Sequence, residues 1–157
     1  MGLMSFFKGV GSKLFGGEEV KAAEQAAPEK AAELKAGALL QHVKDLGLAY
    51  NSLTVKLTGH TVILEGEVAT QEDAEKIALA VGNVETVESV ENNLVVETPA
   101  PEAQYHTVVS GDSLSKIAKE VYGDAMKYPL IFEANKPMLK SPELIYPGQV
   151  LRIPALV

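Results

Sequence analysis

The stretch SLTVKLTGHTVILEGEV, residues 52–68, alternates apolar and polar side chains on both sides of a glycine. Before that glycine, the apolar side chains occupy every second position, at Leu53, Val55 and Leu57. This alternation is typical of a strand with one buried face. Gly59-His60 predicts a turn, and Val62 to Val68 then predict the returning strand. We therefore expect a β-hairpin at the centre of an α+β domain.

The segments before and after this hairpin predict helices. The first begins at Pro28, which suits the first turn of a helix, and ends before Gly47, which suits the position just after a helix. Its apolar face consists of Leu34, Leu39, Leu40, Val43 and Leu46. In the second helix, Thr70 is the expected N-cap, with Asp73 three residues later, and Gly82 marks the end. Its inner face consists of Ala74, Ile77, Ala78 and Val81.

A last strand over residues 88–96 completes a compact domain, which we place at residues 28–97. Its order is α-β-β-α-β, and both helices are expected on one face of the sheet. Residues 98–104 form a linker that prolines prevent from pairing regularly. Residues 105–157 predict a second small domain in the order β-α-α-β. Its expected strands are Tyr105–Val109 and Gln149–Ile153, and its expected helices are Ser113–Val121 and Ala125–Ala134.

The opening residues, MGLMSFFKGVGSKLFGG, are apolar but are interrupted by Lys8 and Lys13. The apolar run is too short for a secretory signal or for the roughly 18 residues of a membrane span. At helical spacing, Leu3, Phe6, Phe7, Val10 and Leu14 share one face. We expect residues 1–16 to form an amphipathic helical segment that docks on the first domain. Residues 17–27 are expected to be the linker between this segment and the domain. The expected location is cytoplasmic, without stable membrane insertion.

Composition limits the class of function. The net charge of −7 argues against binding to nucleic acid, which needs a basic surface. The chain has no cysteine, which excludes disulfides, thiol catalysis and cysteine-ligated zinc. The histidines, His42, His60 and His106, belong to separate predicted elements, and no nucleophile motif is present. We therefore do not expect an enzyme.

Two parts of the chain resemble known domains. The segments YHTVVSGDSLSKIA, VYG, IFEANK and IYPGQVLRIP resemble a LysM domain over the whole C-terminal region. Residues 53–96 resemble a BON domain in element order, in glycine positions and in the terminal Val-x-x-Val-x-Asn spacing. A short apolar N-terminus followed by one BON and one LysM domain resembles the family of small cytoplasmic bacterial potassium-binding proteins. The resemblance implies that K⁺ is the ligand.

A potassium site is expected to consist of backbone carbonyls, because several neutral carbonyl oxygens can replace the hydration shell of K⁺. A cluster of carboxylates would favour divalent ions instead. The last carbonyls of the helix that ends at Gly82 lack partners within the helix, and the macrodipole favours a cation there. Gly9 and Gly11 could interrupt the opening helix and turn further carbonyls outward. The alternative is that Gly82 is only a helix cap, and that Gly9 and Gly11 belong to a flexible terminus.

The resemblance also implies which residues bind the ion. It implies that six backbone carbonyls hold the ion, those of Phe7, Val10, Ser12, Gly82, Val84 and Val87. It implies too that K⁺ docks the opening segment on BON and draws BON against LysM, as an ion sensor would.

Two alternatives stay open. LysM domains bind N-acetylglucosamine polymers such as peptidoglycan, which is less favoured here because we see no export signal. That groove would comprise Gly111, Asp112, Ser113, Leu114, Asn135, Pro137, Ile145 and Tyr146. The apolar N-terminal face suggests instead a membrane-associated stress protein.

Overall fold

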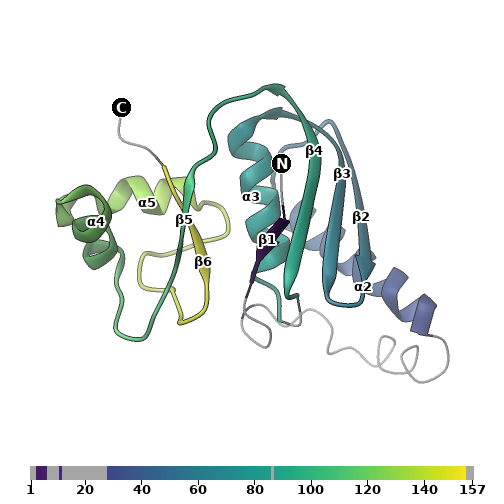
Figure 1. The fold of residues 1–157 in the computed structure, drawn as a ribbon, viewed down its shortest axis with the longest axis horizontal. Coiled ribbons are helices and arrows are strands. Elements are labelled where there is room, and N and C mark those ends of the chain that lie inside the picture. Colours follow the sequence, from purple (N-terminus) through teal and green to yellow (C-terminus); the bar gives the residue numbers. More distant parts are fainter. Residues whose placement is uncertain (1–2, 7–10, 12–27, 86, 155–157) are drawn as a thin grey trace.

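The computed structural model describes residues 3–6, 11, 28–85 and 87–154. It consists of two units, a four-stranded sheet with two helices and a smaller two-stranded sheet with its own helices (Figure 1). We call them the N-terminal domain, residues 28–98 with the opening strand at residues 3–5, and the C-terminal domain, residues 104–154. From residue 28 on, the elements follow the predicted orders, α-β-β-α-β and then β-α-α-β. The predicted α+β fold is therefore confirmed.

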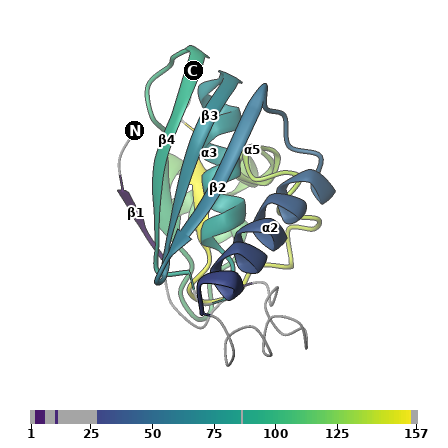
Figure 2. The same cartoon turned by 90° about the vertical axis from the view of Figure 1, so that its right-hand side faces the viewer.

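The sheet of the N-terminal domain has the strand order β1-β4-β3-β2. Its elements are β1 (Leu3–Ser5), α2 (Pro28–Asp45), β2 (Ser52–Thr58), β3 (Thr61–Thr70), α3 (Gln71–Gly82) and β4 (Ser89–Thr98). The predicted hairpin is the antiparallel pair β2–β3, and α3 connects β3 to the parallel strand β4. Both helices cover the same face of this sheet, as expected (Figure 2).

The residues that the sequence predicts at the ends of these helices and strands are found there in the structure. The Thr70 hydroxyl accepts a hydrogen bond of 3.1 Å from the backbone N–H of Asp73, which is the predicted N-cap of α3. Gly47 and Gly59 have positive φ angles of 75° and 62°, which glycine adopts without strain. They end α2 and form the β2–β3 turn, respectively.

The described part of the opening segment differs from the predicted amphipathic helix. Leu3–Ser5 form strand β1, which pairs antiparallel with β4. The backbone N–H of Phe6 continues this pairing by donating to the carbonyl of Glu88 at 2.7 Å. The edge of β4 would otherwise leave unpaired N–H and C=O groups, and satisfying them favours a strand over a helical turn. Residues 7–10 and 12–16 and the predicted linker 17–27 lie outside the described residues.

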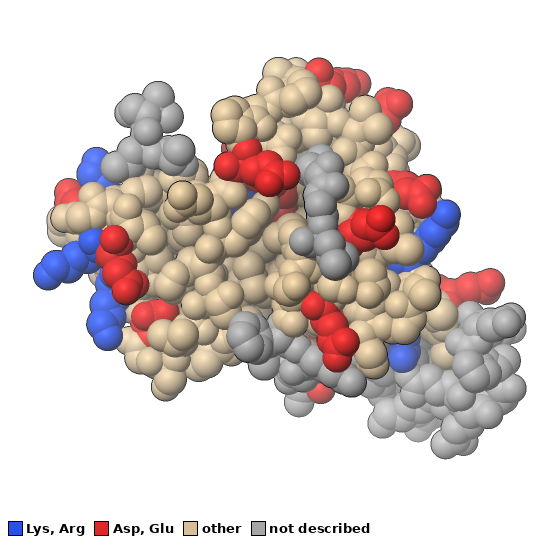
Figure 3. All heavy atoms as spheres, in the orientation of Figure 1, with Lys and Arg blue, Asp and Glu red and all other residues tan. Residues whose placement is uncertain are grey.

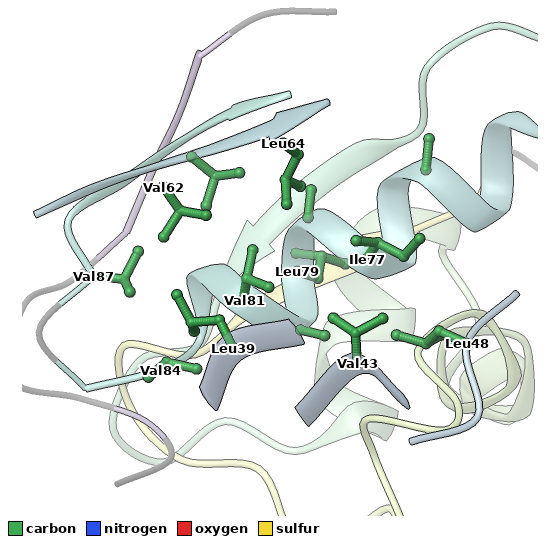
Figure 4. Close-up of a cluster of buried hydrophobic side chains, with 14 of the residues drawn as sticks. Leu39, Val43, Leu48, Val62, Leu64, Ile77, Leu79, Val81, Val84 and Val87 are labelled. Carbon is green, nitrogen blue, oxygen red and sulfur yellow. The ribbon is translucent and has the colours of Figure 1, made fainter. Parts of the chain in front are cut away.

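Helix α3 is the central element of the protein, because it lies between the sheet and the C-terminal domain (Figures 1 and 2). From Ile77 to Gly82 every one of its residues is buried. Figure 4 shows the side chains of Val81, Leu79 and Ile77 among residues from the sheet and from α2. The same core cluster includes Val150 of the C-terminal domain, so the two domains share apolar contacts.

The C-terminal domain has its own small hydrophobic core, distinct from the one beneath the four-stranded sheet. Its elements are β5 (Gln104–Thr107), α4 (Leu114–Tyr122), the 3₁₀ turn η1 (Ala125–Lys127), α5 (Tyr128–Ala134) and β6 (Val150–Ile153). The predicted helix over residues 125–134 is divided into η1 and α5. Pro129 lies at the start of α5 and has no N–H to bond back to the preceding turn, which accounts for the break.

Charge is distributed unevenly over the face shown in Figure 3. Lys and Arg side chains gather at the end of the molecule formed by α4, whereas Asp and Glu are scattered widely over the N-terminal domain. Within the described ranges, no helix has both the length and the apolar character needed to cross a membrane.

Candidate functional site

The C-terminal end of α3 is buried. Gly82, Asn83 and Val84 are all buried there, and the last turn of α3 carries no basic side chain. Helix α2, by contrast, carries His42 and Lys44 in its last turn. The final carbonyls of a helix lack partners within it and carry partial negative charge. The end of α3 therefore places partial negative charge in the interior of the protein. No basic side chain in the last turn of the helix neutralises this charge.

Two valines of the loop that follows α3 have their side chains turned inward. Val84 and Val87 are fully buried, and both point into the cluster beneath the sheet (Figure 4). The backbone N–H of Val87 donates to the carbonyl of Val84 at 3.1 Å, which closes the turn. A carbonyl oxygen has a second lone pair, so this bond leaves one acceptor position on Val84. Any ligand role of these two residues belongs to the backbone.

The opening segment lies directly against this helix end. Gly82 is covered by the ring of Phe6, which is itself only 8% exposed; a Cβ on Gly82 would lie 2.0 Å from the ring. Gly11 packs on the next residue, because a Cβ there would lie 2.0 Å from the backbone oxygen of Asn83. The φ angle of Gly11 is 114°, so glycine is favoured for both reasons.

The six residues that the resemblance implied as potassium ligands fall into two groups. Gly82, Val84 and Val87 are brought together in one buried turn at the end of α3. Phe7, Val10 and Ser12 lie outside the described residues. The described residues next to them in sequence, Phe6 and Gly11, both contact the end of α3. The ligand set stays a prediction.

Asn83 is a site residue that the sequence did not reveal. Its side-chain nitrogen Nδ2 donates to the carbonyl of Val150 at 2.8 Å, and the N–H of Val150 donates to Oδ1 at 2.8 Å. The hydroxyl of Tyr146 lies 3.5 Å from the backbone oxygen of Asn83. The loop after α3 thus contacts the C-terminal domain through polar groups as well as through the apolar core.

A second polar contact between the domains is a buried ion pair. Nε of Arg152 donates to Oε1 of Glu75 at 2.7 Å, and the side chains are only 12% and 1% exposed. The other carboxylate oxygen of Glu75 accepts bonds from the side chain of Gln71 and from the backbone of Ala103. Burial, together with the nearby Glu75 carboxylate, raises the pKa of the Tyr105 phenol. Breaking such a pair is costly, because it leaves one buried charge unpaired.

The residues predicted for a glycan groove do not all lie together in the structure. A surface hollow of about 460 Å³ is lined by Asp112, Ser113, Leu114, Ser115, Tyr128, Pro142, Glu143 and Ile145, four of which were predicted. The remaining predicted residues are Gly111, Asn135, Pro137 and Tyr146. Of these, Asn135 is 1% exposed and its side chain bonds to the backbone of Ile131 and Arg152. Pro137 lies beside α3 residues at the domain contact.

The histidines occupy separate environments. The ring of His106 lies 3.0 Å from the carboxylate of Asp112, which also accepts a bond from the N–H of Val109. Burial lowers the pKa of His42, and the positive charge of Lys140 acts in the same direction, against the opposing effect of Asp45. In the part of the chain that the structure describes, no three His, Asp or Glu side chains converge on a possible metal position.

Comparison with known proteins defines the class. The BON domain model matches residues 35–98, and the LysM domain model matches residues 106–154. The protein is therefore a BON domain followed by a LysM domain, and the two resemblances seen in the sequence are confirmed.

One relative extends this class to a single family. The chain is 41% identical over 155 residues to the potassium binding protein Kbp of Escherichia coli, covering 98% of this chain and 99% of that protein. The chain belongs to the family of that protein. An uncharacterized protein of Deinococcus radiodurans is 38% identical over 76% of this chain and 51% of its own length. The esterase Rv1288 of Mycobacterium tuberculosis matches over 53 residues, which are 34% of this chain and 11% of the esterase.

Proposed function

We propose that this protein is a cytoplasmic potassium sensor. The ion would be held by the backbone carbonyls of Phe7, Val10 and Ser12 in the opening segment, and of Gly82, Val84 and Val87 after α3. The observation that carries the proposal is the contact of Phe6 and Gly11 with the buried end of α3. It occurs in a chain related over almost its whole length to a protein named for potassium binding.

The chemistry of this helix end favours a large monovalent cation. The partial negative charge at the end of α3 attracts a cation, and no basic side chain in the last turn competes for that place. Because Val84 and Val87 point into the core, the groups that they can offer are neutral carbonyl oxygens. Neutral carbonyls replace the loosely held water of K⁺, whereas Mg²⁺ and Ca²⁺ favour sites that include carboxylates.

The proposal includes a change of shape. The LysM domain packs on α3, the same helix whose end carries the proposed ligands. Binding of K⁺ would order the loop after α3 and stabilise this packing, so that the protein becomes more compact when potassium is present. A ligand shifts such an equilibrium only by its difference in affinity for the two states.

Titration calorimetry on the full chain tests the proposal. The protein is dialysed into a buffer whose only cation is a bulky organic one, and KCl and NaCl are titrated in separate runs. We expect saturable binding of K⁺ and clearly weaker binding of Na⁺. Equal affinity for the two ions, or no heat with K⁺, would contradict the proposal.

A second candidate function is glycan binding by the LysM domain. The specific observation is the hollow of about 460 Å³, which is lined by Asp112, Ser113, Leu114 and Ile145 among others. Titration with N-acetylglucosamine oligomers, monitored by NMR shifts of these residues, tests this candidate. Shifts that are confined to the hollow support it, and an unchanged spectrum excludes it.

A further inference from the structure

Two asparagines bind the same edge of β6. Asn83 exchanges two hydrogen bonds with the backbone of Val150, both of 2.8 Å. Two residues further along the strand, Asn135 does the same with Arg152, at 2.9 and 2.7 Å. Residues two apart in a strand present their N–H and C=O groups to the same edge. The two carboxamides therefore take successive positions that a neighbouring strand would otherwise fill.

The two asparagines belong to different domains. Asn135 follows α5 and bonds to β6 of its own domain, so its contact is part of the LysM fold. Asn83 follows α3 of the BON domain and reaches the same strand across the interface. The bonds between Asn83 and Val150 consequently exist only while the two domains are docked.

Asn83 also lies within the proposed ion loop. Its backbone N–H donates to the carbonyl of Leu79 at 2.9 Å and caps α3. Its backbone oxygen faces Gly11 of the opening segment. Its neighbours in the sequence, Gly82 and Val84, are two of the proposed ligands. One residue thus joins the helix end and the opening segment through its backbone, and the LysM domain through its side chain.

We propose that Asn83 is the positioning residue that couples potassium binding to docking of the LysM domain. This inference rests on the proposed function. Hydrogen bonds weaken steeply when they are misaligned, so both bonds to Val150 require one orientation of the Asn83 backbone. Carbonyls turned toward an ion fix the backbone on both sides of Asn83 and hold that orientation. Because coupling is reciprocal, docking then strengthens ion binding by the same factor.

The ion pair between Glu75 and Arg152 offers a matched comparison. It crosses the same interface between the same helix and the same strand, but it begins two turns before the loop. Its carboxylate contacts Arg152, Gln71 and Ala103. We expect this pair to favour docking with and without potassium, whereas the Asn83 contact responds to the ion.

The test uses the full chain and two measurements, the radius of gyration from X-ray scattering and the K⁺ affinity from calorimetry. For the wild type we expect compaction on addition of K⁺. Asn83→Ala removes both hydrogen bonds to Val150 and the longer one from Nδ2 to Sδ of Met138 at 3.4 Å. We therefore expect roughly tenfold weaker K⁺ binding and a radius that no longer responds to K⁺. Glu75→Gln should enlarge the radius in both conditions while keeping its response to K⁺.

Val150→Pro supplies a second test from the other side of the interface. It removes the N–H that donates to Oδ1 of Asn83 and leaves the loop after α3 unchanged. We expect K⁺ to compact this variant less than the wild type.

The outcomes separate the two proposals. Compaction of Asn83→Ala by K⁺ to the same extent as the wild type would overturn the coupling role alone. If the wild type does not bind K⁺, the proposed function and this inference both fail. If Asn83→Ala does not fold, as judged by circular dichroism, Val150→Pro decides, and compaction equal to that of the wild type overturns the coupling role.

Discussion

Helices α2 and α3 lie side by side on the same face of one sheet, but they end in different ways. At the end of α2, backbone N–H groups after the helix bond to the carbonyls of His42, Val43 and Lys44. Two basic residues in its last turn complement the dipole. At the end of α3, the capping N–H of Asn83 bonds to Leu79. Among the described residues, we find no backbone N–H from beyond that helix bonded to its last three carbonyls.

This difference distinguishes a helix end that is complete in itself from one that depends on other parts of the chain. The end of α3 is covered by Phe6 and Gly11 from the opening segment and by Val150 from the LysM domain. A buried helix end whose last carbonyls lack backbone N–H partners among the described residues is suited to binding a cation.

The largest effect is expected for Gly82→Ala, compared with Gly37→Ala in the middle of α2. A methyl group on Gly82 would displace the Phe6 ring, whereas a Cβ on Gly37 meets no atom within 4 Å. We expect Gly82→Ala to cost about 1–3 kcal/mol and to abolish measurable K⁺ binding. Gly37→Ala should stabilise the protein by up to about 1 kcal/mol. Thermal unfolding and calorimetry measure both quantities, and equal K⁺ affinity in the two variants would contradict the contact with Phe6.

A somewhat smaller effect is expected for Gly11→Ala. A Cβ at this position meets the backbone of Asn83, and the positive φ angle is strained for alanine. The matched control is Gly47→Ala at the end of α2, which has a positive φ angle but open space around it. We expect both variants to lose about 1 kcal/mol of stability from backbone strain. Gly11→Ala should lose further stability from the overlap with the Asn83 backbone, and it alone should lose K⁺ affinity. A loss of K⁺ affinity in Gly47→Ala would contradict the proposed difference between the ends of α2 and α3.

Thr70→Ala alters the opposite end of α3. The substitution removes the N-cap bond to Asp73, so we expect unfolding to become easier by about 1 kcal/mol. Because the ligands are proposed at the other end of the helix, K⁺ affinity measured under native conditions should stay within about twofold of the wild type. A larger loss of affinity would mean that general destabilisation of α3, and not the loop, governs ion binding.

The smallest effect concerns the end of α2 and its dependence on pH. The pKa of His42 is lowered in the folded protein, mainly by burial. The folded state therefore binds this proton less readily than the unfolded state, and stability falls as the pH drops below about 6.5. We expect the difference between the melting temperatures at pH 7 and pH 5.5 to be larger in the wild type than in His42→Gln. An identical pH dependence in the two proteins would exclude this role of His42.

The sequence was sufficient for features that depend on neighbouring residues. The hairpin at residues 52–68, the Thr70 cap and the Gly47 helix end each follow from a few adjacent side chains. The strand Leu3–Ser5 was missed, because its helical spacing was a local signal and its partner, the edge of β4, lies far along the chain. Tertiary pairing prevailed over the local pattern.

The domain interface could not be predicted for the same reason. Asn83 follows a glycine at a helix end, where an asparagine is usually a cap, so its role on β6 has no local signal. The ion pair of Glu75 could not be predicted either, because its partner Arg152 is 77 positions away in the sequence. One signal was available, because the run from Ile77 to Val81 is apolar on every side of the helix. A helix of that kind is buried all round, which indicates a second packing partner for α3.

A crystal structure with Tl⁺ in place of K⁺ tests the carbonyl site most directly, because Tl⁺ has a strong anomalous signal. We expect one anomalous peak at the end of α3, within ligand distance of the carbonyl oxygens of Gly82, Val84 and Val87, and we expect added K⁺ to compete for this site. A peak elsewhere, or none in crystals of a protein that binds K⁺ in solution, would contradict the carbonyl site.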